Sequence, residues 1–172
     1  MQKNVEKFGI SDKRGRLRTS SDPFVSSKVV PEPALCRRCQ TYLHNKRWIY
    51  SPETYHRLES EPNVHWLTCP ACKKVSEGYV VGILNLSGSY LWEHEEEIRH
   101  LIKNEEAKAF RKNPHERIIR IARQDEELLV ETTEQRLAEH LGRVLHRAHS
   151  GELEINWGSD ADICRVKWER EL

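Results

Sequence analysis

Four of the five cysteines in this chain form two Cys-x-x-Cys pairs, a spacing that is typical of a metal site. The first pair is Cys36 and Cys39, and the second is Cys69 and Cys72. Four thiolates around one Zn²⁺ ion make a closed structural site, which leaves no coordination position for a substrate. The alternative is two unrelated pairs of free or disulfide-bonded cysteines. We expect one structural zinc ion held by these four residues.

Other residues that could do chemistry are weaker candidates. The sequence has no phosphate-binding loop, dinucleotide fingerprint or nucleophile elbow. Most of the nine histidines lie among charged residues, which favours solvated helix faces, although His44 or His65 could replace a cysteine at the metal. Cys164 lies on the apolar side of a predicted strand and is interpreted as a small buried hydrophobic residue. These patterns favour a protein that is not an enzyme, and a zinc hydrolase is the least favoured alternative.

The charge of the chain is unevenly distributed, although its net value is only +1. Residues 1–75 hold 14 Lys/Arg and 7 Asp/Glu, whereas residues 76–172 hold 14 and 20. A basic N-terminal part is typical of a polyanion-binding surface. The predicted RNA contacts are its basic side chains: Lys13, Arg14, Arg16, Arg18, Arg37, Arg38, Lys46, Arg47, Lys73 and Lys74. The alternative for those beside the cysteines is that they only balance the thiolate charge.

Aromatic residues are interleaved with this positive charge. They are Tyr42, Trp48, Tyr50, Tyr55 and Trp66. Aromatic side chains mixed with cations are used for stacking on unpaired bases. A small zinc module also needs aromatic residues in its core, so we expect two or three of them to be buried there.

The elements that must position the cysteines lie in the first half of the chain. Residues 1–35 predict a basic, extended arm, and residues 36–76 predict a zinc ribbon with a helical insertion. Within the ribbon, residues 41–50 predict a strand or hairpin arm. Ser51 caps a short helix from Pro52 through Leu58, and residues 64–68 form a returning strand.

Residues 77–172 predict a separate domain with a regular alternation of elements. We expect a strand at 78–86, apolar on both faces, a helix at 90–110, and strands at 117–123 and 127–131. A capping box at residues 132–135 then begins a helix that Gly151 ends, and strands follow at 152–157 and 162–169. The fold class is therefore α+β: a zinc ribbon followed by a ferredoxin-like βαββαβ(β) domain, with two helices on one face of an antiparallel sheet.

The order of these parts resembles a known family. The two cysteine pairs lead into Gly78-Tyr79-Val80 and a strand, then into a helix containing Leu91-Trp92-Glu93-His94 and Leu101-Ile102-Lys103; a later helix contains Leu137-Ala138. This layout resembles the N-terminal zinc region and following α+β domain of the archaeal and eukaryotic large-ribosomal-subunit export adaptor family. The family's zinc region has more cysteine pairs than this chain. The resemblance implies association with the ribosome or ribosomal RNA, and a small prokaryotic relative.

These observations predict a non-enzymatic zinc-binding protein that associates with RNA, in particular with the ribosome or its large subunit, through the arm and the ribbon. The alternative is a zinc-stabilised protein–protein interaction or regulatory adaptor, and a protein partner is also expected at the α+β domain. No apolar run approaches the roughly 20 residues that cross a bilayer, and the N-terminus lacks a secretory signal. We therefore expect a cytoplasmic protein without a membrane partner.

Overall fold

The computed structural model describes residues 23–24, 26, 28–158 and 163–172. The chain forms two units, residues 1–30 and 31–172. In the first unit, the Ser26 hydroxyl donates a hydrogen bond to the carbonyl of Lys28 at 3.2 Å. The four predicted RNA contacts of the arm, Lys13, Arg14, Arg16 and Arg18, lie outside the described residues.

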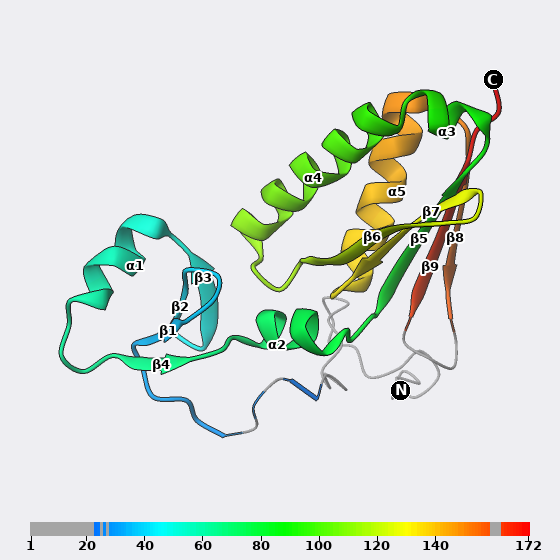
Figure 1. Ribbon diagram of the computed structural model, residues 1–172. Helices are drawn as coiled ribbons and strands as arrows, with labels where there is room; N and C mark the ends of the chain where they lie inside the picture. Colours follow the sequence, from blue (N-terminus) through cyan, green and yellow to red (C-terminus); the bar gives the residue numbers. More distant parts are fainter. Residues whose placement is uncertain (1–22, 25, 27, 159–162) are drawn as a thin grey trace, which may run out of the picture. The chain divides into compact units, whose positions relative to one another are not determined.

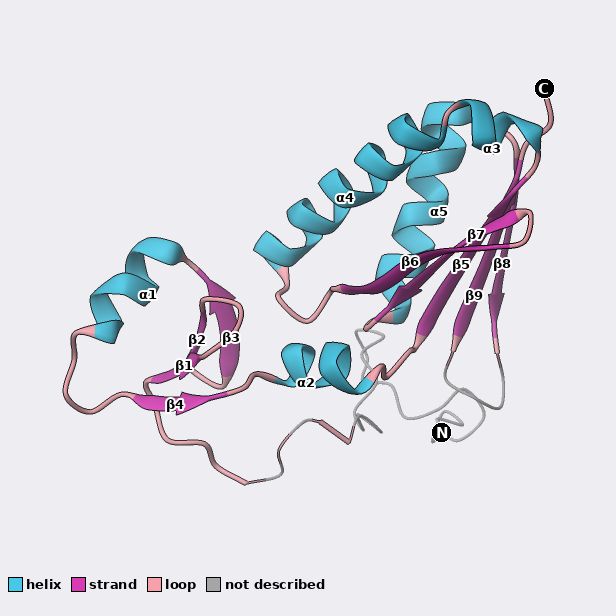
Figure 2. Ribbon diagram, in the orientation of Figure 1, coloured by secondary structure: helices cyan, strands magenta, loops and turns pink. Residues whose placement is uncertain are grey.

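A small four-stranded sheet forms the ribbon (Figures 1 and 2). Its strands, β1 (Ala34–Cys36), β2 (Thr41–His44), β3 (Arg47–Tyr50) and β4 (His65–Leu67), are arranged in the order β3-β2-β1-β4. Strands β1 and β4 are parallel, and the other pairs are antiparallel. The predicted hairpin and returning strand are thus confirmed. The Glu32 carboxylate accepts hydrogen bonds from the backbone N–H groups of Asn45 (2.9 Å) and Lys46 (2.8 Å), which fixes the tip of the hairpin.

Two short helices complete the ribbon. Helix α1 (Pro52–Glu59) begins after Ser51, whose hydroxyl accepts a hydrogen bond from the Thr54 N–H, so the predicted cap is confirmed. Helix α2 (Pro70–Glu77) begins inside the second cysteine pair and ends at Gly78, which has a left-handed backbone conformation. This second helix was not predicted from the sequence. It joins the ribbon directly to the larger sheet.

The larger sheet is mixed and has five strands. They are β5 (Gly82–Ser87), β6 (Ile118–Gln124), β7 (Glu127–Thr132), β8 (Glu152–Trp157) and β9 (Cys164–Glu169), in the order β6-β7-β5-β9-β8. Helices α4 (Glu95–Lys112) and α5 (Gln135–His149) lie on one side of it, and the short α3 (Ser89–Glu93) precedes α4 (Figure 1). Apolar residues of α5 and of the strands build the main core, in which Trp168, Leu84 and Leu141 are almost completely buried.

The ferredoxin-like arrangement is not confirmed, although the elements follow one another in the predicted order. The prediction of a wholly antiparallel sheet is wrong, because β5 and β9 are parallel along their full length. The hairpin of β8 and β9 places the last strand beside the first and moves β8 to the edge. An alternating apolar pattern indicates which face of a strand is buried, but not which strand is its neighbour.

Three local predictions also need correction. The strand expected at 78–86 begins at Gly82, and its burial alternates, so it is not apolar on both faces. The helix expected at 90–110 is interrupted at His94. The capping box is absent because Thr132 ends β7 and donates its hydroxyl hydrogen bond to the carbonyl of Glu134, which is the residue before α5.

Candidate metal centre and adjoining pocket

The pairing of β1 with β4 brings the two cysteine pairs together. Cys36 ends β1 and lies opposite Leu67 of β4, two residues before Cys69. The Arg37 N–H extends this pairing by donating to the Leu67 carbonyl at 3.0 Å. Cys72 then lies in the first turn of α2, where the helix directs it back to the first pair. A parallel strand pair followed by a helix therefore sets the spacing of the ligands.

The four sulfur atoms form a compact cluster of the size that a tetrahedral metal requires. All four lie within 4.8 Å of one another, with Cys36 Sγ 3.9 Å from Cys72 Sγ and Cys39 Sγ 3.6 Å from Cys69 Sγ. Zinc–sulfur bonds of about 2.3 Å in a tetrahedron separate the sulfurs by about 3.8 Å. Disulfide bonds would need about 2.05 Å, and all four cysteines are free. The cluster can therefore hold a metal ion.

Backbone N–H groups point at the sulfurs, as expected for thiolate ligands. Cys36 Sγ accepts hydrogen bonds from the N–H groups of Arg38 (3.5 Å) and Cys69 (3.3 Å), and Cys69 Sγ accepts one from Cys72 (3.4 Å). Cys69 is also the N-cap of α2, so its negative charge lies at the positive end of a helix. These donors orient the ligands, because they satisfy thiolate lone pairs that the metal does not use.

The pKa values of the four thiols shift in opposite directions. Hydrogen bonds from the other three thiols lower the pKa of Cys36 far below its ordinary value. The pKa of Cys39 is lowered to about 7, with the bond to Cys36 acting upward and those from the second pair acting downward. The interaction with Cys36 raises the pKa of Cys69 and of Cys72. Four sulfurs this close together, three of them on buried residues, thus cannot all be anionic without a counter-charge, which a divalent cation would supply.

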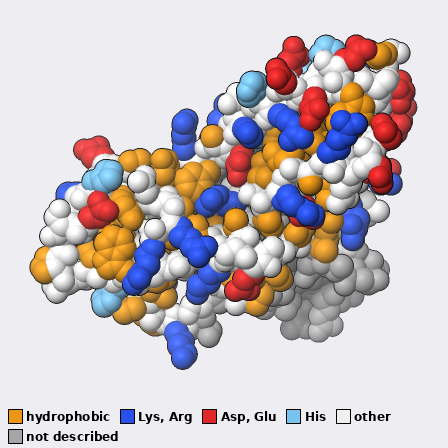
Figure 3. All heavy atoms as spheres, in the orientation of Figure 1, with side chains coloured by type: hydrophobic (Ala, Val, Ile, Leu, Met, Phe, Trp, Pro, Cys, Tyr) orange, Lys and Arg blue, Asp and Glu red, His pale blue; other side chains and the backbone are white. Residues whose placement is uncertain are grey.

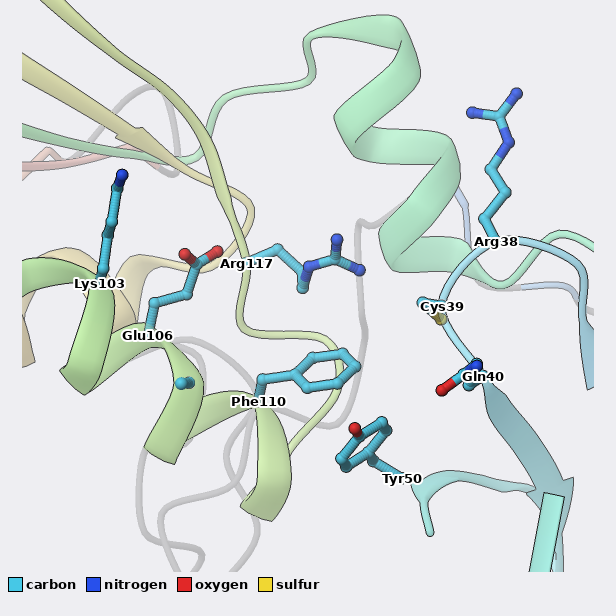
Figure 4. A pocket seen from close by; sticks show the side chains of 9 residues that line it. Arg38, Cys39, Gln40, Tyr50, Lys103, Glu106, Phe110 and Arg117 are labelled. Atoms are coloured by element: carbon cyan, nitrogen blue, oxygen red, sulfur yellow. The ribbon is translucent and has the colours of Figure 1, made fainter. Parts of the chain in front are cut away.

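Arg117 connects the cysteine cluster to the larger domain. Its Nη1 donates to Cys72 Sγ at 3.7 Å, and its guanidinium lies 5.1 Å from the centre of the Phe110 ring. Phe110 in turn packs on Tyr50 of β3, with 4.8 Å between ring centres and 55° between ring planes. Figure 4 shows these side chains meeting between α4 and the first cysteine pair. The sequence pattern predicted no functional role for Arg117 or Phe110, because both lie far from the cysteines along the chain.

The predicted basic contacts of the ribbon do not all reach the surface. Arg37, Arg38, Lys46, Arg47 and Lys73 are exposed. Lys74, in contrast, is only 2% exposed. Its ammonium group lies 3.0 Å from the Glu134 carboxylate and donates to the Thr133 carbonyl. Lys74 therefore attaches α2 to the start of α5 and is not part of the exposed basic surface.

The aromatic residues of the ribbon divide in the same way. Tyr55 is buried, and its hydroxyl donates to the Cys36 carbonyl at 3.0 Å. Tyr42, Trp48 and Tyr50 are half-buried, whereas Trp66 is 41% exposed. Figure 3 shows Lys and Arg side chains on the visible face of both the ribbon and the larger domain, while acidic side chains are more frequent toward the end that carries α3.

A hollow of about 350 Å³ opens beside the metal cluster (Figure 4). The ribbon and the region of α4 and β6 both contribute to its wall: Arg38, Cys39, Gln40, Tyr50, Lys103, Glu106, Ala107, Phe110 and Arg117. Burial raises the pKa of the Glu106 carboxyl, although the N–H of Ile118 donates to it at 2.6 Å. The hollow thus combines two aromatic rings, three cations and one carboxyl group.

Comparisons with known proteins identify no relative: the chain matches no family model, no curated protein and no solved structure. The resemblance to the export adaptor family therefore stays a prediction. Among the described helices, none is long and apolar enough to cross a membrane.

Proposed function

We propose that this chain is a zinc-stabilised RNA-binding protein without catalytic activity, and that its ribbon is the RNA-binding surface. The observation that supports this proposal most directly is the position of the exposed cations around the cysteine cluster. Arg37 and Arg38 lie inside the first pair, and Lys73 follows the second. Zinc is the metal that four cysteine thiolates favour, and a closed four-sulfur site serves folding and not catalysis.

Three separate elements supply the positive charge. The first cysteine pair presents Arg37 and Arg38, the turn between β2 and β3 presents Lys46 and Arg47, and α2 presents Lys73. Lys46 has a left-handed backbone conformation, with φ of 61°, and its N–H donates a hydrogen bond to the Glu32 carboxylate. Fixed cations at several points suit a phosphate backbone, since they contact it without reading its sequence.

The cations exceed what the metal site needs. Arg117 donates directly to Cys72 Sγ, backbone N–H groups donate to Cys36 and Cys69, and the Thr41 hydroxyl lies 3.0 Å from Cys39 Sγ, while Lys74 is paired with Glu134. Arg37, Arg38 and Lys73 are exposed to solvent. This arrangement favours phosphate binding over the alternative that these side chains only balance thiolate charge. The target that we propose is ribosomal RNA of the large subunit, which the protein would bind in the cytoplasm.

A charge-neutralisation experiment tests the proposal. We expect the triple variant Arg37→Gln, Arg38→Gln, Lys73→Gln to bind structured RNA more weakly than the wild type. The slope of log K against the logarithm of the salt concentration should be smaller in magnitude than in the wild type by about 2, because each phosphate contact contributes about 0.7 to 0.9 to the slope. Filter binding across a salt series measures both quantities. RNA retention that is negligible or independent of salt in the wild type would contradict the proposal.

The matched control removes the same charge from the larger domain. Arg147, Arg165 and Lys167 are exposed and lie on α5 and β9. Replacing all three with Gln should leave the salt slope within about 0.5 of the wild-type value if the ribbon carries the contacts. Equal losses in both triple variants would indicate nonspecific attraction by the whole molecule.

A protein-interaction role remains a second proposal, supported by one feature of the larger sheet. Trp157 is 48% exposed and ends β8, which lies at an edge of that sheet. Exposed tryptophans are enriched at protein interfaces. Co-purification with a protein complex that survives RNase treatment but is lost on Trp157→Ser would favour this role.

A further inference from the structure

We propose that the hollow beside the metal cluster holds a single unpaired nucleotide of the RNA strand, with its base against Tyr50 and Phe110 and its phosphate against Arg38 and Lys103. This inference deepens the proposed function and rests on it. It assigns a specific site to unpaired RNA, whereas the surface cations alone account for attraction to any phosphate backbone.

The shape and size of the hollow suit a small ligand. Its volume of about 350 Å³ lies within the range of ligand sites, about 300 to 1,000 Å³. One wall comes from α4, where Lys103, Glu106 and Phe110 recur at the spacing of one helix face (Figure 4). The other wall comes from the ribbon, through Arg38, Gln40 and Tyr50. Ala107 of α4 also lines the hollow. Its side chain is small and exposed, which leaves the entrance open.

The aromatic side chains of the hollow are accessible. Tyr50 and Phe110 are both half-buried, and their rings are tilted by 55° at 4.8 Å. Arg117 lies over the Phe110 ring and adds a guanidinium plane to the same group. Aromatic rings and guanidinium planes are the surfaces on which unpaired bases stack. A fully paired base presents no free face, so this chemistry selects single-stranded RNA.

The polar side chains complete the recognition of a nucleotide. Arg38 and Lys103 are exposed cations on opposite walls, suited to a phosphate group. The Gln40 amide can both donate to and accept from a base edge, and the Glu106 carboxyl can accept from a base amino group. An aliphatic or purely anionic ligand would leave the aromatic rings unused. A nucleotide uses all three kinds of side chain.

The test adds a negative charge at the entrance and keeps every side chain that we assign to the nucleotide. Ala107→Glu places a carboxylate one helical turn from Lys103, where it repels a phosphate and pairs with the lysine. We expect its affinity for single-stranded RNA to fall about tenfold at about 100 mM salt, while Ala107→Lys binds as tightly as the wild type or more tightly. Asn156→Glu, an exposed site on β8, is the control with the same charge change, and it should change affinity less than twofold.

The measurement uses the zinc-loaded full chain and three probes: a fluorescent single-stranded 12-mer, the duplex of the same length, and guanosine monophosphate. We expect Ala107→Glu to weaken the binding of the single strand and of guanosine monophosphate, and to leave the binding of the duplex unchanged. RNA containing 4-thiouridine should crosslink on irradiation to the peptide that holds Tyr50 or Phe110. Circular dichroism shows that each variant is folded.

The outcomes separate this inference from the proposed function. RNA binding that is equally weakened by Ala107→Glu and Asn156→Glu, or crosslinks that map only elsewhere, would overturn the pocket and leave the basic surface standing. If the wild type binds no RNA, the proposed function fails, and the proposal for an RNA nucleotide fails with it. In that case, monophosphate binding that Ala107→Glu abolishes would assign the hollow to a free nucleotide instead.

Discussion

Removal of zinc from the full chain should unfold the ribbon and leave the larger sheet intact. The two parts differ in what holds them together. In the ribbon, the buried cluster at the metal consists of three of the cysteines, Cys36, Cys69 and Cys72, together with Ala71. A second buried cluster of the ribbon contains three residues. The core of the larger domain contains fourteen buried residues. A core of a few side chains cannot offset the ordering of its backbone without a metal.

The size of the effect follows from the metal site. Structural zinc contributes about 10 to 16 kcal/mol of apparent folding free energy in small domains near neutral pH. Its loss also frees Cys36 Sγ and Cys69 Sγ, which accept the N–H bonds of Arg38, Cys69 and Cys72 and are then no longer fixed by the metal. If the loss of zinc lowers the free energy of local opening of the ribbon by only about 4 kcal/mol, amide exchange there should accelerate about a thousandfold.

Hydrogen exchange with mass spectrometry measures this effect segment by segment. After chelation we expect rapid exchange in residues 34–77, whereas the peptides of β5, β9 and α5 keep their protection. Cys69→Ser should reproduce the effect and reduce the zinc content. Cys164→Ser is the matched control, since Cys164 is buried in β9 outside the cluster and should leave zinc content at one ion per chain.

Two results would refute this reasoning. Unchanged protection of residues 34–77 after confirmed zinc loss would show that the ribbon folds without the metal. Simultaneous loss of protection in the larger sheet would show that the two parts form one cooperative unit, so that the contacts of Arg117 and Lys74 dominate over the separate cores.

Three further predictions concern packing and charge. Gly142→Ala should destabilise the protein by about 1 to 3 kcal/mol in urea unfolding, because the new Cβ would lie 2.5 Å from a methyl of Val166, which outweighs the gain in helix propensity. Lys74→Ala should cost about 2 to 4 kcal/mol because it breaks the ion pair between a buried ammonium group and the half-buried Glu134, whereas Lys73→Ala should change stability by less than about 0.5 kcal/mol. Glu106→Gln should exceed the wild type in thermal stability at about pH 7 but match it near pH 4. Burial raises this carboxyl's pKa, so its stabilising contribution is complete below the ordinary carboxyl pKa and declines as pH rises through the raised value.

Each of these predictions has a control. Asn104→Ala, at an exposed position of α4, should raise stability by a few tenths of a kcal/mol, so a similar gain at Gly142 would disprove the clash. A double-mutant cycle of Lys74 with Glu134 should give a coupling energy of at least about 1 kcal/mol. A pH profile of Glu106→Gln parallel to that of the wild type would show that this carboxyl does not titrate as inferred.

The sequence was sufficient to predict features that depend on local chemistry. The spacing of the cysteines predicted the cluster, Ser51 and Pro52 predicted the start of α1, and the alternation in residues 152–157 predicted β8. In each case neighbouring residues determine the outcome, through side-chain reach, capping or the two-residue period of a strand.

The sequence was insufficient wherever the outcome depends on which elements become neighbours. Nothing local distinguishes Lys73 from Lys74, yet the direction of α2 exposes one and buries the other against Glu134. The parallel pairing of β9 with β5 depends on the return path of the β8–β9 hairpin. Phe110 joins the hollow only because α4 passes beside the ribbon.

The central claim is that one zinc ion builds an RNA-binding surface from the ribbon. Hydrogen exchange of the zinc-loaded chain with and without single-stranded RNA tests it most directly. We predict slower exchange on RNA binding in residues 36–50 and 70–75 and in the C-terminal half of α4, with β8 unchanged. RNA binding accompanied by protection only in the larger sheet, or by no protection in the ribbon, would contradict the account.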